Sequence, residues 1–323
     1  MPIRMFHIGF EFVNPGFPKT DIISQHFSDP EDKIVFDIRE SNVLVIGNSV
    51  RPEDIPNIVN FNKGPKILYV GEPIGKFGFS HIFDQIFAKN MYDYAIGCIS
   101  NNPSMNWIKC PFYYNMATNF KEVNAYVSTT QLEKKNVCTL ISRHDPGNTR
   151  LPILKELSKY MHVVCPGRLA NNCSSEEVDR LGTPEYIKNF IFNICSENFA
   201  DSHPGYITEK LMNCCLGGAI PIYFGNLDEI DQQIFNKERI LFLNANNVEE
   251  VAKRVMQLCL NLELMEQFYR QPVFQDTAEE AVKSIGDGVK TFCKGGKPTV
   301  SPTTPSIEKG GFKGNLRFPF NLS

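Results

Sequence analysis

The chain has 323 residues, of which 42% are hydrophobic and 21% are charged, and its formal net charge is −3. A chain of this length can form two domains that each bury a core, and these proportions are typical of globular proteins. Because the net charge is small, the protein has no overall attraction for nucleic acid or an anionic membrane, and any affinity for phosphate must be local.

No window of the sequence comes near the roughly 18 consecutive apolar residues of a membrane-spanning helix. Residues 1–8 are too short and too mixed for the apolar core of a signal peptide. We therefore expect no transmembrane segment and a cytoplasmic location. The ten cysteines are scattered, several lie in apolar runs, and no Cys-x-x-Cys pair has metal spacing, so we expect reduced, buried cysteines.

The first third of the chain alternates short apolar runs with polar, turn-rich stretches. The apolar runs predict buried strands, and a segment such as 80–89 predicts a crossover helix between two of them. This pattern is typical of a parallel sheet with helices, and we assign residues 1–134 to a first α/β domain. The expected strands are 33–38, 42–47, 66–73 and 92–97.

A second α/β domain is expected over residues 135–293. It begins with a β-α-β unit of strand 136–142, helix 150–160 and strand 162–165. Residues 294–323 are rich in Gly, Pro, Thr and Lys and predict a flexible tail. Periodicity alone equally permits a dehydrogenase or a two-lobed binding protein. The remaining expected elements are strands 190–195, 219–225 and 239–243 and helix 248–260.

The most informative stretch is the polar loop and helix start at residues 196–211, between two predicted buried strands. We expect the helix to begin at Tyr206 or Ile207. Its first turn would then present unpaired N–H groups and the positive end of the helix dipole to the loop. Lys210 would lie in this first turn, where a cation is normally disfavoured. The combination predicts a bound anion such as a diphosphate.

The same stretch resembles the signature of the α-1,3/4-fucosyltransferases, glycosyltransferase family ten. The matching positions are Glu197-Asn198, the run YITEKL at 206–211 and the run IPIYFG at 220–225. A match of this length is far more specific than a lone glycine pattern. The resemblance implies a GT-B architecture, in which an acceptor-side Rossmann-like domain faces a GDP-fucose-binding Rossmann-like domain across a cleft. The resemblance is to a soluble member of the family, of the bacterial or viral type.

By this resemblance, the expected reaction is the inverting transfer of L-fucose from GDP-fucose to a glycan hydroxyl, α-1,3 to N-acetylglucosamine. Such a transfer needs a base for the acceptor hydroxyl and positive charge for the departing GDP. Glu72 is the candidate base, since it follows a predicted strand and matches the place of the family's catalytic glutamate. The alternative for Glu72 is a solvated loop carboxylate.

Five further residues are expected at the donor. Arg150 follows the loop 145–149 and could hold two phosphate oxygens, and Lys210 matches the signature lysine. Asn198 and Tyr206 match positions that contact the donor in the family, and Glu209 would suit a ribose or fucose hydroxyl. The alternatives are an exposed helix charge for Lys210, a favourable first-turn carboxylate for Glu209 and a turn residue for Asn198.

The sequence has no Asp-x-Asp in a loop after a strand and no His/Cys cluster with ligand spacing. We therefore expect no required metal or cofactor, with stimulation by divalent ions left open. Ser196 departs from the family pattern, which usually has an apolar residue there. Two alternative functions remain: a GT-B transferase for another nucleotide sugar, and a non-catalytic nucleotide-sugar-binding protein.

Overall fold

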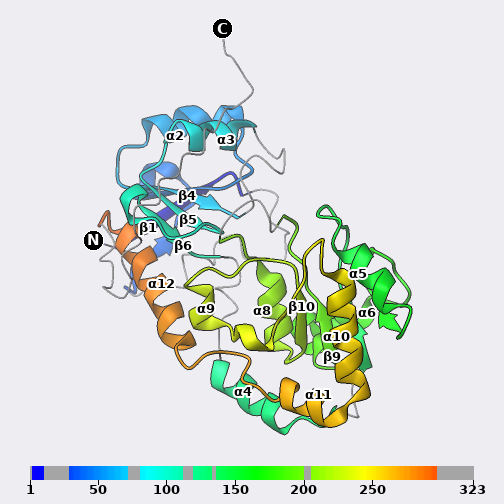
Figure 1. The fold of residues 1–323 in the computed structure, drawn as a ribbon. Coiled ribbons are helices and arrows are strands. Elements are labelled where there is room, and N and C mark those ends of the chain that lie inside the picture. Colours follow the sequence, from blue (N-terminus) through cyan, green and yellow to red (C-terminus); the bar gives the residue numbers. More distant parts are fainter. Residues whose placement is uncertain are drawn as a thin grey trace.

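The computed structural model describes residues 2–10, 29–71, 81–111, 119–132, 136–199 and 205–296. Its strands form two parallel sheets, one from each half of the chain (Figure 1). No helix in these ranges is long and apolar enough to cross a membrane. All ten cysteines are free.

The first sheet has the strand order β2-β1-β3-β4-β5-β6. The strands β3 (Val43–Ile46) and β5 (Tyr94–Gly97) are buried along their whole length, as expected for a parallel sheet covered on both faces. The helices α2 (Ile55–Asn60) and α3 (His81–Ala88) cover one face, where Ile58 and Ile86 join the apolar core (Figure 1). The strands are β1 (Arg4–Ile8), β2 (Lys33–Ile34), β3 (Val43–Ile46), β4 (Lys66–Val70), β5 (Tyr94–Gly97) and β6 (Trp107–Lys109).

The strand predicted at 33–38 is wrong in length, since β2 ends at Ile34. The side chain of Asp37 accepts a hydrogen bond of 2.8 Å from the backbone N–H of Arg39. This bond caps a short 3₁₀ helix, Ile38–Glu40, so the chain turns away from the sheet.

The second sheet has the strand order β11-β10-β9-β7-β8. Its strands are β7 (Asn136–Thr139), β8 (Val163–Val164), β9 (Phe190–Ile194), β10 (Ile220–Tyr223) and β11 (Leu241–Phe242). The helices are α5 (Arg150–Leu157), α6 (Glu176–Leu181), α7 (Thr183–Ile187), α8 (Glu209–Leu216), α9 (Asp231–Ile234), α10 (Val248–Leu260) and α11 (Leu262–Tyr269). The helix predicted at 248–260 has the bounds of α10, and its apolar stripe packs against α5.

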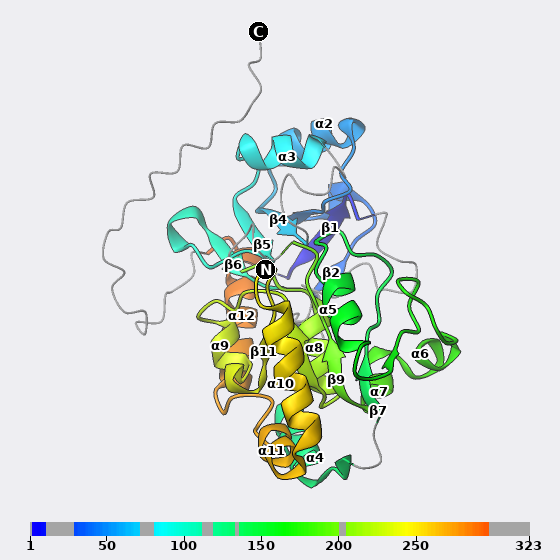
Figure 2. The ribbon, with the colours of Figure 1, turned by 45° about the vertical axis from the view of Figure 1, so that its right-hand side comes forward.

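Two helices cross between the halves of the chain. Helix α4 (Phe120–Thr129) precedes β7 but packs on α8 of the second sheet, and Asn124 of α4 accepts hydrogen bonds from the backbone N–H groups of Val273 and Phe274. Helix α12 (Ala278–Cys293) returns to β6 of the first sheet, and its Phe292 ring stacks on Tyr94 at 4.2 Å (Figures 1 and 2).

Along the sequence, the last strand of the first sheet ends at Lys109 and the first strand of the second sheet begins at Asn136. The helices do not divide between the two sheets at the same point. Helix α12 lies against the first sheet closely enough that a Cβ on Gly288 would come within 2.6 Å of the Ile108 side chain. The domain ranges 1–134 and 135–293 therefore stay a prediction, and the tail at 294–323 lies outside the described residues from 297 onward.

Candidate functional site

The candidate site lies at the carboxyl edge of the second sheet. In this sheet β8 lies on one side of β7, and β9, β10 and β11 follow on the other. The chain therefore reverses its direction of winding between β7 and β9. Open α/β sheets bind ligands at such a switch point, beyond the carboxyl ends of the strands. Arg150 follows β7 and Glu197 and Asn198 follow β9, so these residues flank this point.

Asp145 and Gly147 shape the loop after β7. The carboxylate of Asp145 accepts hydrogen bonds from the backbone N–H groups of Thr149 at 3.0 Å and Leu151 at 2.9 Å, which satisfies donors at the start of α5. A Cβ on Gly147 would lie 2.7 Å from the carbonyl oxygen of Asn198. Glycine therefore allows the loops after β7 and β9 to touch.

Arg150 joins these two loops from inside. The residue is 2% exposed, and its Nη2 donates to the carbonyl oxygen of Ser196 at 2.6 Å and to Oδ1 of Asn198 at 2.8 Å. Its Nη1 donates to the carbonyl oxygen of His144. Burial lowers the pKa of the guanidinium from its ordinary value. Much of this side chain is thus committed to protein contacts, and its phosphate role stays a prediction.

Glu197 is the buried centre of the site, with an exposed fraction of 1%. Its Oε1 accepts from the backbone N–H of Thr208 at 2.8 Å and from the phenol of Tyr223 at 3.4 Å. Its Oε2 accepts from the Thr208 hydroxyl at 2.6 Å and from Nζ of Lys210 at 3.4 Å. A buried carboxylate needs such partners to be tolerated.

Glu197 also explains why the helix predicted to begin at Tyr206 or Ile207 begins at Glu209 instead. The two bonds from Thr208 to Glu197 hold Thr208 in an extended conformation, with φ −117° and ψ −164°. A helical turn through Thr208 is incompatible with this backbone.

Lys210 lies in the first turn of α8, as predicted, and its side chain is 25% exposed. The ammonium donates to the Thr208 hydroxyl at 2.8 Å and lies 3.6 Å from the carboxylate of Glu209. The pKa of nearby His144 is lowered, first by burial and then by the positive charges of Arg150 and Lys210. Arg150 and Lys210 thus bring two positive charges near His144. The carboxylates of Asp145, Glu197 and Glu209 lie near Arg150.

Four of the five predicted donor residues form two pairs in the structure. Arg150 and Asn198 are bonded to each other, and Lys210 and Glu209 form an ion pair at the start of α8. Tyr206 is 1% exposed and so lies inside the protein. Sequence reasoning missed Glu197 and Thr208 as site residues. The signal for Glu197 was an acidic residue separated by one position from the apolar run 190–195, where burial of its charge would require partners.

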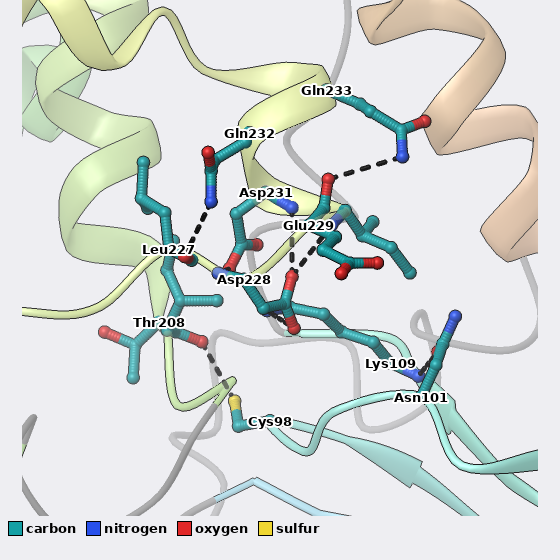
Figure 3. Close-up of polar contacts among 12 residues, drawn as sticks. Cys98, Asn101, Lys109, Thr208, Leu227, Asp228, Glu229, Asp231, Gln232 and Gln233 are labelled. Carbon is teal, nitrogen blue, oxygen red and sulfur yellow. Dashed lines mark hydrogen bonds and ion pairs between the residues drawn. The ribbon is translucent and has the colours of Figure 1, made fainter. Parts of the chain in front are cut away.

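A second buried cluster joins the two sheets (Figure 3). Lys109, at the end of β6, is fully buried and donates to Asp228 at 2.8 Å and to Asp231 at 2.5 Å. Burial lowers the pKa of Lys109, but the two carboxylates outweigh it and the net shift is upward. Burial raises the pKa of Asp231 to about 6, against the opposing effect of Lys109.

The loop after β5 meets the segment that leads into α8. The thiol of Cys98 donates to the carbonyl oxygen of Ile207 at 3.0 Å (Figure 3). Gly205 has φ +82°, and a Cβ there would lie 2.7 Å from the backbone nitrogen of Ser100. The carboxyl end of the first sheet is thereby packed against the candidate site.

Glu72 and residues 200–204 lie outside the described residues. The described chain reaches Gly71, directly after β4, and β4 pairs with β5. Glu72 is thus two residues beyond the end of a strand whose neighbour contacts the segment before α8. Its role as a base stays a prediction.

A cavity of about 940 Å³ lies at the opposite edge of the first sheet. Its lining includes Asn42, Pro65 and Asp93, each of which directly precedes a strand. Ligands of parallel sheets bind beyond the carboxyl ends of strands, so this cavity is not part of the candidate site. No group of His, Cys, Asp and Glu side chains that could hold a metal ion occurs in the part of the chain that the structure describes.

Comparison with known proteins places this site inside a family match. Residues 130–295 match the model described as glycosyltransferase family 10 (fucosyltransferase) C-term. The chain is 27% identical over 142 residues to 4-galactosyl-N-acetylglucosaminide 3-alpha-L-fucosyltransferase 9 of Homo sapiens, covering 44% of this chain and 38% of that protein. It is 30% identical over 145 residues to alpha-(1,3)-fucosyltransferase B of Drosophila melanogaster, covering 42% and 32%. The chain thus matches less than two fifths of the length of these relatives.

Solved structures share the fold over most of the chain. A crystal structure of an α1,3-fucosyltransferase superimposes with a TM-score of 0.61 and 18% identity, covering 91% of this chain and 90% of that one. HepE of Anabaena gives a TM-score of 0.53 and 9% identity, covering 91% and 100%. These likenesses and the two parallel sheets establish the predicted GT-B architecture.

Proposed function

Because the chain belongs to glycosyltransferase family 10, the fucosyltransferase family, we propose that it transfers L-fucose from GDP-fucose to a hydroxyl group of a glycan. The proposal rests on the described site as well as on the family. The matched residues 130–295 contain Arg150, Glu197 and Lys210, which lie together at the switch point of the second sheet.

The position of Lys210 is the observation that carries the proposal. Its ammonium is partly exposed in the first turn of α8, where the helix dipole alone would favour a negative charge. A diphosphate at this end of the helix would be stabilised by both the ammonium and the dipole. Such stabilisation acts on the charge that develops as GDP departs, and so it would lower the barrier to transfer.

We propose that transfer is a single displacement with inversion. The acceptor hydroxyl gives its proton to the carboxylate of Glu72 as its oxygen forms a bond to the anomeric carbon of fucose. The bond from that carbon to the β-phosphate oxygen breaks at the same time, and the electron pair leaves with GDP. Glu72 suits this role because it follows β4 by two residues in the sequence, and the loop after the neighbouring strand β5 contacts the segment before α8.

The identity of donor and acceptor is taken from the proteins that this chain resembles. The name of the human relative specifies a 3-α-L-fucosyltransferase acting on a galactosyl-N-acetylglucosaminide. A further solved α1,3-fucosyltransferase of the same fold was obtained with GDP-fucose. By analogy, we propose O3 of N-acetylglucosamine as the acceptor position of this chain.

We also propose that transfer needs no metal ion, since Lys210 and the start of α8 can supply the positive charge that a metal would otherwise give. Protein dialysed against EDTA should therefore transfer fucose at the rate of untreated protein. A loss of activity that Mg²⁺ or Mn²⁺ restores would overturn this part of the proposal.

The function is tested by incubating purified protein separately with GDP-fucose, GDP-mannose, UDP-galactose and UDP-N-acetylglucosamine, with and without N-acetyllactosamine. Release of GDP from GDP-fucose alone, with an α-1,3-fucosylated product by NMR, is expected. Turnover of another donor would refute the fucose assignment and keep the transferase fold. Binding of GDP by calorimetry without turnover of any donor would indicate a binding protein.

A further inference from the structure

Glu197 has a place in the site that the mechanism above does not use. Its carboxylate is the only component of the described donor site that is both charged and fully inaccessible, with a side-chain exposure of 0%. Each of its oxygens accepts two hydrogen bonds, and all four donors come from the segments that surround the start of α8 and the end of β10. Burying a carboxylate is costly, so a position with four converging donors is a built one.

The first effect of Glu197 is on Thr208. As the N-cap residue of α8, Thr208 would ordinarily accept a hydrogen bond from the next turn of the helix through its hydroxyl. Its side chain makes no such bond, because the hydroxyl donates to Glu197 and accepts from Lys210 instead. Glu197 thus turns the usual cap away from the end of the helix that faces the proposed diphosphate.

The second effect is on Lys210. The ammonium is held on three sides, by the Thr208 hydroxyl at 2.8 Å, by Glu197 at 3.4 Å and by Glu209 at 3.6 Å. The interaction with Glu197 offsets the unfavourable interaction of a lysine with the positive end of the helix dipole. Without the buried carboxylate, this flexible four-carbon side chain would keep only Thr208 and the partly exposed Glu209 as the partners named here, and its position would be less restricted.

We propose that Glu197 is a positioning residue that acts on transfer through Lys210, holding the ammonium and Thr208 where the leaving diphosphate develops charge. This inference rests on the function proposed above. The Glu197 side chain has an exposure of 0% and bonds to Thr208, so we place it behind the surface that would contact the donor. Arg150 holds the same loop from the other side, through the carbonyl oxygen of Ser196 and the side chain of Asn198.

This role predicts a specific kinetic signature for Glu197→Gln. The neutral amide holds the ammonium less strongly than the carboxylate does, yet the site gains positive charge, so GDP should bind within about threefold of the wild-type affinity. The ammonium would no longer meet the developing charge of the transition state, and kcat should fall at least about tenfold. Lys210→Met should instead weaken GDP binding and lower kcat together.

The test is a double-mutant cycle of Glu197→Gln and Lys210→Met, with kcat and GDP affinity measured for all four proteins. If Glu197 acts through Lys210, Glu197→Gln should lower kcat no further in the Lys210→Met background. Effects that multiply would refute the inference. Glu156→Gln is the matched control, because it neutralises the partner of Lys159 on α5, away from the site, and should change neither quantity.

A second readout needs no donor. Without the carboxylate of Glu197, the amine of Lys210 should be less restrained and more reactive. Acetylation of Lys210 by acetic anhydride, followed by mass spectrometry, should therefore be at least about fivefold faster in Glu197→Gln than in the wild type. An unchanged rate would refute the inference even if fucose is transferred. A faster rate in a protein that binds no GDP would keep the Glu197–Lys210 coupling and refute the function instead.

If Glu197→Gln does not fold, Thr208→Val replaces it. This nearly isosteric change removes the hydroxyl that bridges Glu197 and Lys210 and leaves the buried charge in place. It should lower kcat with GDP affinity unchanged and accelerate acetylation of Lys210. Wild-type values for both would contradict the positioning role.

Discussion

The guanidinium of Arg150 donates a hydrogen bond of 2.8 Å to the side-chain oxygen of Asn198, 48 residues further along the chain. Both residues were predicted as donor ligands, and the structure shows that they hold each other. Three of the five N–H groups of Arg150 are used on protein oxygens. The residue therefore ties the loops after β7 and β9 together at the switch point of the sheet.

Replacing Arg150 by lysine should destabilise the protein, because a single ammonium cannot reach three oxygens on two loops. Each hydrogen bond from a charged group contributes about 1.5–3 kcal/mol, so a loss of roughly 3 kcal/mol is expected. Thermal unfolding with and without GDP measures it. A variant with wild-type stability and weaker GDP binding would assign Arg150 to the ligand alone.

Replacing Glu72 by glutamine should keep GDP binding and lower transfer by on the order of 100-fold, as expected when a general base is removed. Calorimetry with GDP and the initial rate of fucose transfer measure the two effects separately. Equal rates for the variant and the wild type would show that another group accepts the proton.

Replacing Lys109 by methionine should leave Asp228 and Asp231 with no cation between them at the junction of the sheets. Removing one partner of a buried ion pair typically costs about 3–5 kcal/mol. The variant should therefore unfold at a clearly lower temperature or urea concentration than the wild type. The triple variant with Asp228→Asn and Asp231→Leu should recover part of this loss, and failure to recover any would mean that the charges do not interact as the geometry indicates.

Stability should depend on pH through His7 of β1. Burial lowers the pKa of His7 from 6.5 to about 4, and its Nδ1 has no hydrogen-bond partner among the described residues. The unfolded chain therefore binds a proton at a higher pH than the folded protein does. The stabilisation is complete above pH 6.5 and is lost as the pH falls towards 4, by up to about 3 kcal/mol. Urea unfolding between pH 7.5 and 4.5 should show a steeper fall in the wild type than in His7→Leu.

Patterns that depend on local order in the chain could be read from the sequence. The apolar run at β3 is buried at every residue, and the amphipathic period of 248–260 matches α10. The signature positions 197–198 and 206–211 were predicted to lie between two buried strands, and in the structure they lie between β9 and β10.

Features that depend on single side chains meeting over long distances could not be read in this way. The bonds of Thr208 to Glu197 delay the start of α8 to Glu209. The contact of Asn124 with Phe274 spans 150 residues, and no periodicity indicates it. Local propensity is overridden at these points by tertiary hydrogen bonds, which are more favourable than the turn or strand that they replace.

The crossing of α4 and α12 has a consequence for how the protein folds and comes apart. Helix α4 precedes the strands of the second sheet but packs on α8, and helix α12 follows them but packs on β6 of the first sheet. A division of the chain at the start of β7 therefore leaves neither half with the whole of its core. Cutting the chain between α4 and β7 would leave Tyr94 without Phe292 on one fragment and Phe274 without Asn124 on the other. The two sheets are therefore expected to unfold in one cooperative transition, and the second sheet is not expected to fold as an independent unit.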